Sequence, residues 1–230
     1  MRLNKYVALA TGMSRRAADA VIAEGRVLVN GEMPSIGLSV ASTDTVLLDN
    51  TPITPAVKTT ILLNKPAGYV SSRAGQGSQT IYDLLPAELH HLKPIGRLDK
   101  ESSGLLLLTN DGELAQELTH PSHQKQKVYE VEINKSLAKE DYVAIKETGV
   151  DIGDGRPSRF QLQQLGTRKQ QSAKPLVPNS YFLVTLTEGR NRQIRRTFAT
   201  LGYKVIRLHR TKFGDYLING LREGHYRVVS

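Results

Sequence analysis

The sequence contains no cysteine. The chain can therefore form no disulfide bond, no thiolate metal site and no cysteine nucleophile. It also has no run of about 18 apolar residues, the length that a membrane-spanning helix needs. Its first residues, MRLNKYVALATG, lack the long apolar stretch of a signal peptide. These absences favour a cytoplasmic protein without a membrane-embedded part.

Acidic residues are fewer than basic ones, 22 against 31, which gives a formal net charge of +9. Residues 1–56 hold five of each kind, so the excess comes entirely from residues 57–230. The segment 186–212 alone holds eight lysines and arginines against one acid, Glu188. Such a concentrated positive charge is typical of a nucleic-acid-binding face. A basic surface without a partner would have the same composition.

The chain divides near residue 56, where Asp49-Asn50-Thr51-Pro52 and Pro55 are typical of a linker. We therefore expect two domains, at residues 1–56 and 57–230. A length of 230 residues is enough for each to have its own core.

The first domain begins with two short helices. Residues 2–10 place apolar side chains on one helical face and are followed by Gly12, which favours a helix end. Ser14 can cap a second helix over residues 15–24. A strand then enters Asn30-Gly31, a pair typical of a tight hairpin turn. The pattern predicts a small module of helices and a β-hairpin.

The second domain is predicted as α+β with a mixed, largely antiparallel sheet, because strands and helices follow each other without a regular βαβ rhythm. Val128, Glu130 and Glu132 alternate with apolar residues, which indicates a strand with one buried face. The polar, proline-containing segment 166–180 is predicted as a long mobile loop. The expected strands are 60–64, 105–109, 127–133, 181–187 and 204–209, and the expected helices are 80–86, 112–119, 138–147 and 191–201.

Residues 96–112, GRLDKESSGLLLLTNDG, are the most informative stretch. Leu105 to Leu108 form an apolar run bounded by turn residues, which predicts a buried strand. Asp99 precedes this strand in a polar turn, between Arg97 and Lys100. Loops anchored to a core strand are where catalytic groups concentrate. From spacing alone, however, a solvated aspartate in a surface turn is the more common arrangement.

The predicted helix at 191–201 has two distinct faces. Asn191 can cap it, and an apolar stripe follows at helical spacing. Arg192, Arg195 and Arg196 share a second face, where they repel one another unless an anion neutralises them. A polyanion or a buried carboxylate is therefore the expected partner, with a solvated basic surface as the alternative.

Four segments in this order resemble RNA pseudouridine synthases, in particular the RsuA branch that modifies ribosomal RNA. GRLDKESSGLLLLTNDGEL resembles the catalytic signature, NKPAGYV at 64–70 the first motif, KVYEV at 127–131 the Lys-x-Tyr motif, and EGRNRQIRRTFATLG at 188–202 the third motif. The resemblance covers nearly the whole chain. It implies conversion of a specific uridine to pseudouridine in ribosomal RNA, which requires no cofactor and no metal.

The resemblance also implies roles for individual residues. Asp99 matches the catalytic aspartate, Tyr129 the tyrosine that stacks on the base, and Arg195 a basic residue that pairs with the aspartate; Arg97 supports the site. Without the resemblance, Tyr129 would be read as an ordinary core tyrosine of a strand. The residues expected to bind RNA are Arg2, Lys5, Arg15, Arg16, Lys127, Arg190, Arg192 and Arg196.

Residues 1–56 resemble the small RNA-binding module of a small-subunit ribosomal protein and of tyrosyl-tRNA synthetases, through SRRAADAVIAEGRVLVNGE. The implied partner is ribosomal RNA or a pre-ribosomal particle, bound by a monomer. Large-subunit RNA is slightly favoured by GRNRQIRR, although the compact length is closer to the small-subunit enzyme. The alternative function is a non-catalytic RNA-binding or ribosome-assembly protein, against which the intact Asp99, Tyr129 and Arg195 set argues.

Two points of chemistry stay open at this stage. The carboxylate could attack the ribose, attack the uracil ring or act as a base, and the residues do not choose among these roles. His90-His91 and His120-x-x-His123 could suggest a metal, but Pro121 interrupts the second pair and no cysteine or carboxylate completes a set. We interpret them as polar loop histidines.

Overall fold

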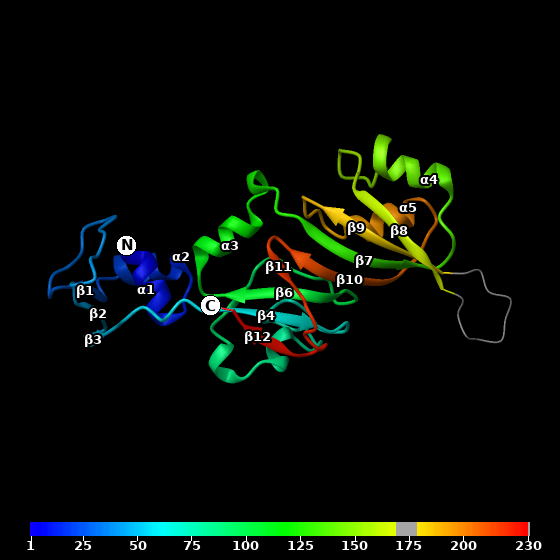
Figure 1. The fold of residues 1–230 in the computed structure, drawn as a ribbon. Coiled ribbons are helices and arrows are strands. Elements are labelled where there is room, and N and C mark those ends of the chain that lie inside the picture. The colour runs from blue at the N-terminus through cyan, green and yellow to red at the C-terminus, as the bar shows by residue number, and fades with distance from the viewer. Residues whose placement is uncertain (169–178, 230) are drawn as a thin grey trace. The chain divides into compact units, whose positions relative to one another are not determined.

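The computed structural model describes residues 1–168 and 179–229. The chain forms two compact units, Met1–Thr59 and Thr60–Ser230, so the division falls three residues after the predicted boundary. Figure 1 shows the elements of each unit. None of the helices in the described ranges is long and apolar enough to cross a membrane.

The first unit contains two helices and a three-stranded sheet. Helices α1 (Leu3–Thr11) and α2 (Arg15–Ala23) agree with the prediction. Gly12 ends α1 in the left-handed conformation, and the Ser14 hydroxyl accepts a hydrogen bond from the amide of Ala17 at the start of α2. The sheet has the order β1 (Val27–Val29), β2 (Val46–Leu48), β3 (Thr51–Pro52), and the apolar core comprises Leu3, Val7, Ala18, Val27, Val29, Val40 and Val46.

The predicted hairpin at Asn30-Gly31 is only partly right. Both residues have positive φ, and Val29 and Glu32 exchange backbone hydrogen bonds across the turn. The pairing stops at this single bridge, and β1 pairs instead with β2, an antiparallel partner further along the chain. The tight turn is a local property of Asn-Gly, whereas the strand partner depends on which later residues are apolar enough to cover the helices.

The second unit is built on one mixed sheet with the order β12-β4-β6-β10-β7-β9-β8, to which β5 and β11 add short pairings. Only the β6–β10 pairing is parallel among the described strands, so the prediction of a largely antiparallel mixed sheet is confirmed. The strands are β4 (Thr60–Lys65), β5 (Lys93–Pro94), β6 (Ser103–Thr109), β7 (Lys127–Ile133), β8 (Gln161–Arg168), β9 (Asn179–Leu186), β10 (Val205–Phe213), β11 (Tyr216–Leu217) and β12 (Tyr226–Val228).

The helices of this unit agree with the prediction in place more than in type. Helix α3 (Gly112–Thr119) matches the expected range, and α5 (Gln193–Thr200) is shorter than expected. The predicted helix 80–86 is a short 3-10 helix, η1 (Ile81–Leu84), and two further 3-10 helices are η2 (Ala87–Leu89) and η3 (Pro121–His123). The predicted helix 138–147 consists of α4 (Lys139–Val143) and a π-helical turn, η4 (Ala144–Thr148).

The predicted loop at 166–180 is wrong at both ends. Residues 166–168 belong to β8, and residues 179–180 belong to β9, which pairs with β8 in antiparallel register. Residues 169–178 lie outside the described residues. Strand β8 was not predicted because its sequence, QLQQLGTR, is mostly polar. A strand at the edge of a sheet needs only one apolar face.

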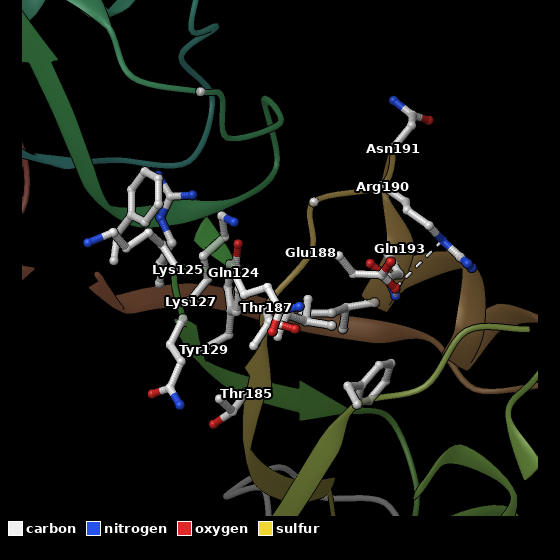
Figure 2. Close-up of a pocket in the computed structure, with 18 of the residues that line it drawn as sticks. Gln124, Lys125, Lys127, Tyr129, Thr185, Thr187, Glu188, Arg190, Asn191 and Gln193 are labelled. Atoms are coloured by element: carbon white, nitrogen blue, oxygen red, sulfur yellow. Dashed lines mark hydrogen bonds and ion pairs between the residues drawn. The ribbon is translucent and has the colours of Figure 1, made fainter. Parts of the chain in front are cut away.

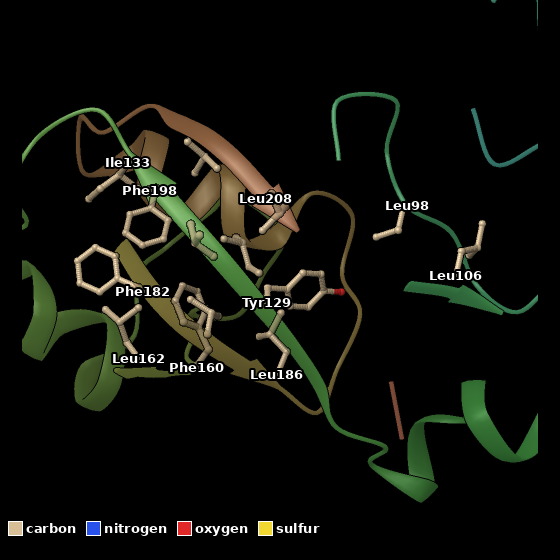
Figure 3. Packing of buried hydrophobic residues seen from close by; sticks show 14 of the residues in the cluster. Leu98, Leu106, Tyr129, Ile133, Phe160, Leu162, Phe182, Leu186, Phe198 and Leu208 are labelled. Carbon is tan, nitrogen blue, oxygen red and sulfur yellow. The ribbon is translucent and has the colours of Figure 1, made fainter. Parts of the chain in front are cut away.

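The four leucines of β6 are fully buried because this central strand has apolar layers on both sides. Leu106 and Leu108 belong to the larger core cluster, together with Tyr129, Phe182 and Phe198 (Figure 3). The other two, Leu105 and Leu107, pack with Leu118 and Phe213 in a second cluster. The prediction of a buried strand is confirmed, and the strand gives the turn that precedes it a rigid support.

Candidate active site

Asp99 lies in the turn directly before β6 and lines a cleft of about 1060 Å³. Its side chain is 32% exposed, so the carboxylate is accessible from the cleft. Arg97 and Tyr129 line the same cleft, as do Lys127 and Arg190. Figure 2 shows side chains from β7, from the end of β9 and from the segment before α5 around this space. The structure thus brings residues from three separate motifs to one cavity.

Neighbouring residues of the first motif fix the backbone on either side of Asp99. The Ser71 hydroxyl donates a hydrogen bond to the carbonyl of Leu98 at 2.9 Å. The amide of Gly68 donates to the carbonyl of Lys100 at 2.7 Å, and the amide of Ser102 closes the turn on the carbonyl of Asp99 at 3.0 Å. The position of the carboxylate is therefore set by backbone contacts and does not depend on its own side chain alone.

Lys65 supports the same turn from inside the protein. It is fully buried at the end of β4, and its ammonium donates to the carbonyls of Pro66 (2.8 Å) and Ser102 (2.7 Å). Burial lowers its pKa to about 8, although the negative charges of Asp99 and Glu101 act in the opposite direction. A buried lysine thus connects the first motif with the end of the aspartate turn.

The residue that pairs with Asp99 is Arg192, so the predicted Arg195–Asp99 ion pair is wrong for this structure. Arg192 Nη1 lies 3.6 Å from Asp99 Oδ2 and 2.9 Å from Glu101 Oε2. The Arg192 hydrogen bond is the main reason why the pKa of Glu101 lies below its usual range. Arg195 instead donates to the carbonyl of Glu101 at 3.0 Å and to that of Val205 at 3.2 Å. Arg195 therefore holds the backbone of the turn, and Arg192 pairs with the carboxylate of Asp99.

The start of α5 explains why these two arginines exchange roles. The N-cap is Arg192, in the left-handed conformation with φ of 48°, and no side chain caps the helix, so the predicted cap at Asn191 is wrong. Arg192 precedes the first helical residue, so its side chain does not lie on the helix face that carries Arg195, as it would in a regular helix. Its side chain is directed towards the aspartate turn.

Two other arginines of the third motif are held by Asp154. Arg190 Nε lies 3.3 Å and Arg196 Nη1 lies 3.4 Å from Asp154 Oδ2. Arg190 also donates to the carbonyl of Arg156 at 3.0 Å, and only 9% of its side chain is exposed. Arg196 also donates to the carbonyl of Ile152. Both were predicted to contact RNA, and both are occupied inside the free protein.

Tyr129 combines a buried ring with access to the cleft. It is 8% exposed on the buried face of β7, and Figure 3 shows its oxygen directed away from Phe182 and Phe198. Lys127 lies two residues earlier on the same strand, half-buried, with its ammonium 5.1 Å from the centre of the Phe213 ring. Arg97 is exposed at the rim.

The four basic residues predicted to bind RNA in the first domain belong to the other compact unit. Arg2, Arg15 and Arg16 are exposed, and Lys5 is partly buried. Another cation of that unit, Arg26, forms two hydrogen bonds with Asp49, at 2.8 and 2.6 Å, and therefore stabilises the fold.

Sequence reasoning missed Arg210, a buried cation of the site, and gave Lys65 only as part of a segment that shapes the loop near the site. Arg210 is 2% exposed on β10 and lines the cleft. Lys65 lies within the quoted NKPAGYV motif, where only a structural role of the loop was expected, and Arg210 lies just beyond the third motif. A signal was present for Arg210, since it falls in the basic segment 186–212. Within the described residues, no group of three or more histidines and carboxylates is arranged to hold a metal ion.

Comparison with known proteins agrees with this geometry. A family model described as RNA pseudouridylate synthase matches residues 59–200. The chain is 35% identical over 233 residues to ribosomal large subunit pseudouridine synthase B of Bacillus subtilis (strain 168), covering 100% of this chain and 92% of that protein. It is also 35% identical to the dual-specificity RNA pseudouridine synthase RluF of Escherichia coli (strain K12), covering 100% of this chain and 76% of that protein.

A solved structure described as a pseudouridylate synthase has a TM-score of 0.67 and 32% identity, and the match covers 100% of this chain and 96% of that one. The family model includes strands β4 to β9, the aspartate turn and all of α5, whereas β10, which also lines the cleft, lies beyond it. The chain belongs to the RNA pseudouridine synthase family, as its four ordered motifs predicted.

Proposed function

We propose that this enzyme converts a uridine of ribosomal RNA to pseudouridine and that Asp99 is its catalytic carboxylate. The single observation that carries the proposal is the position of Asp99, accessible in the cleft on a turn held by Lys65, Gly68 and Arg195. A reaction at a fixed point of the ribose needs a group held this rigidly. The relatives named for large-subunit ribosomal RNA favour that RNA as substrate.

The proposed reaction breaks the bond between ribose carbon 1′ and uracil nitrogen 1, turns the base, and joins carbon 1′ to uracil carbon 5. The proton of carbon 5 leaves and nitrogen 1 gains one, so no group is oxidised and no second substrate is consumed. Asp99 acts as nucleophile on the ribose or the base, or as a base at the ribose. The target nucleotide must leave its stack to reach the cleft.

Tyr129 is proposed to stack on the extruded uracil. Its ring lies at the edge of the apolar core and its hydroxyl is directed away from that core, so one side of the ring has rigid support (Figure 3). Arg192 is proposed to stay beside Asp99 and to stabilise its carboxylate during the reaction, and Arg97 to support the site. As an enzyme of ribosomal RNA or of a pre-ribosomal particle, the protein would work in the cytoplasm, as a monomer.

The experiment that tests this proposal compares the full chain with its Asp99→Asn variant on unmodified ribosomal RNA. We expect release of label from uridine carbon 5 to be lost, while RNA affinity stays within a few fold, because the substitution removes one charge and keeps the shape. Persistent turnover in the variant would refute the role of Asp99. RNA binding without turnover by the full chain itself would support the alternative, a non-catalytic RNA-binding or assembly protein.

The first unit, residues 1–59, is proposed to add affinity for RNA without taking part in the chemistry. Arg15 and Arg16 are exposed in the first turn of α2, where the helix dipole disfavours cations and an external anion would stabilise them. We expect Arg15→Gln with Arg16→Gln to raise the RNA concentration for half-maximal rate severalfold and to leave the rate at saturating RNA unchanged. A lower rate at saturation would contradict this division of roles.

A further inference from the structure

Lys127 and Arg210 form a cationic pair in the wall of the cleft. The ammonium of Lys127 lies 5.1 Å and the guanidinium carbon of Arg210 lies 4.9 Å from the centre of the Phe213 ring. Both residues line the same cleft as Asp99. Two cations on one aromatic ring attract the ring and repel each other. The pKa of Lys127 is lowered mainly by burial and further by repulsion from Arg210.

Among the described residues, no carboxylate forms a close pair with these two cations; the charge of Glu188 acts on Lys127, but Glu188 forms its ion pair with Arg156. Within residues 1–168 and 179–229, no carboxylate lies at ion-pair distance from Lys127 or Arg210. Arg210 is 2% exposed, and its Nη2 is buried without a hydrogen-bond partner. An uncompensated buried guanidinium is costly. The arrangement therefore favours an anion that arrives with the ligand.

Strand pairing fixes Arg210 in this position. Its Nε donates to the carbonyl of Leu105 at 2.8 Å, and its Cα partner on the parallel strand β6 is Gly104. The strands approach so closely here that a Cβ on Gly104 would lie 2.3 Å from the carbonyl oxygen of Arg210. A register shift follows Arg210 in the pairing of β10 with β7. Such bulges change the direction of neighbouring side chains and are common beside active sites.

Three other cations of the cleft differ from this pair because they have carboxylate partners inside the protein. Arg192 pairs with Glu101, Arg190 with Asp154, and Lys125 with Glu117. A phosphate at one of these three residues would have to displace a carboxylate. At the Lys127 and Arg210 pair, a phosphate would displace only water.

We propose that Lys127 and Arg210 bind a phosphodiester group of the RNA immediately beside the target uridine. This inference rests on the proposed function, because a ribose placed at Asp99 brings the two phosphates of its nucleotide into the same cleft. Arg210 is Cα-paired with Gly104, five residues after Asp99, so the pair and the carboxylate are at the same part of the sheet. A phosphate held here fixes the ribose relative to Asp99 and selects an extruded nucleotide over a stacked one.

The test is phosphate-ethylation interference with the full-length protein. The probe is unmodified ribosomal RNA transcript with about one ethylated, and thus neutral, phosphate per molecule. Bound and converted RNA are separated, and the ethylated positions are mapped for wild type, Lys127→Gln and Arg210→Lys. Arg207→Gln is the matched control. Arg207 lies on β10, the strand of Arg210, is exposed, and pairs with Glu130 outside the cleft.

In the wild type, we expect ethylation of one phosphate beside the converted uridine to weaken binding about tenfold, the size of one charge-assisted hydrogen bond. In Lys127→Gln the same ethylation should weaken binding by only about threefold, because one of the two cationic partners of the phosphate is already absent. Arg207→Gln should keep the wild-type pattern. The Lys127 variant carries the test if Arg210→Lys does not fold.

An unchanged interference pattern in Lys127→Gln would overturn the proposal, and so would loss of the same signal in Arg207→Gln. The binding pattern is independent of turnover. If the wild type converts no uridine, the proposed function fails, while a signal lost only in Lys127→Gln still supports the phosphate site.

Discussion

The cleft has two basic walls that differ in how their charge is balanced. The wall formed by Arg190, Arg192 and the start of α5 contains ion pairs with Asp154, Glu101 and Asp99. The wall formed by β7 and β10 carries Lys127 and Arg210, which have no ion-pair partner in the described part of the chain. The basic segment 186–212 contributes to both walls, with Arg190 and Arg192 in the first and Arg210 in the second.

The difference indicates two uses of positive charge. The paired arginines hold loops and the aspartate turn in place, because each connects segments that are distant in the sequence. The unpaired cations keep a favourable potential for an incoming phosphate. Substitutions that unbalance the first wall, or that separate structural from ligand-binding cations, test this distinction.

The largest effect is expected from Asp154→Asn, which removes the shared partner of Arg190 and Arg196. Since 9% of the Arg190 side chain is exposed, its nearly buried charge would keep only Glu188 Oε1, at 3.9 Å, as an ion-pair partner among the described residues. We expect the free energy of unfolding to fall by about 3 kcal/mol, at the lower end for such pairs because Asp154 is itself partly exposed. Urea denaturation measures the change, with the exposed Glu147→Gln as control.

The same variant should make the first wall resemble the second. Freed from Asp154, Arg190 and Arg196 become available to phosphates, so the salt dependence of RNA binding should steepen by roughly one to two phosphates. Unchanged stability together with an unchanged salt slope would show that the ion pairs at Asp154 do not distinguish the two walls.

A smaller effect is expected at Lys65, a cation that forms no ion pair in the described residues and holds the fold through hydrogen bonds to carbonyls. Its pKa is about 8, below the value of 10.5 for an ordinary lysine, because it is buried. The folded protein therefore holds this proton less tightly than the unfolded chain does, and stability conferred by Lys65 rises as the pH increases from about 8 towards 10.5. Relative to Lys65→Met, the wild type should gain about 2 kcal/mol over this range.

The measurement is the difference in unfolding free energy between wild type and Lys65→Met at several pH values, in which the titration of all other groups cancels. A difference that stays constant across this range would mean that Lys65 keeps its proton in the folded state. Lys65 would then be a fixed positive charge beside Asp99, contrary to the low pKa that its burial implies.

Local pattern was sufficient for much of the fold. The apolar run Leu105–Leu108 and the alternation in β7 predicted buried strands, since both depend only on neighbouring residues. Strand β8 was missed because a polar edge strand has no such signal and is stabilised by its pairing with β9. Sequence could place Asp99 and Tyr129 in one site only through the family motifs.

The partner of Asp99 could not be predicted in the same way. A helical wheel groups Arg192 with Arg195, but the left-handed conformation of Arg192 takes it off that wheel. The left-handed conformation of Arg192 is stabilised by its tertiary contact with Glu101, a residue 91 positions earlier in the sequence. The burial of Lys65 is equally non-local, because lysine is ordinarily an exposed residue.

The smallest effect is expected at Arg192, and it separates this residue from Arg196. Arg192→Ala removes the cation 3.6 Å from Asp99, so we expect the turnover rate to fall about tenfold, or about 1.4 kcal/mol, with RNA affinity nearly unchanged. Arg196→Ala, the matched control on the same segment, should instead lower stability through Asp154 and leave the turnover rate of the folded protein intact. Single-turnover kinetics at saturating RNA isolates the chemical step from binding. If Arg192→Ala weakened binding and left that step unchanged, Arg192 would serve as a phosphate contact, and the paired wall would contribute to binding after all.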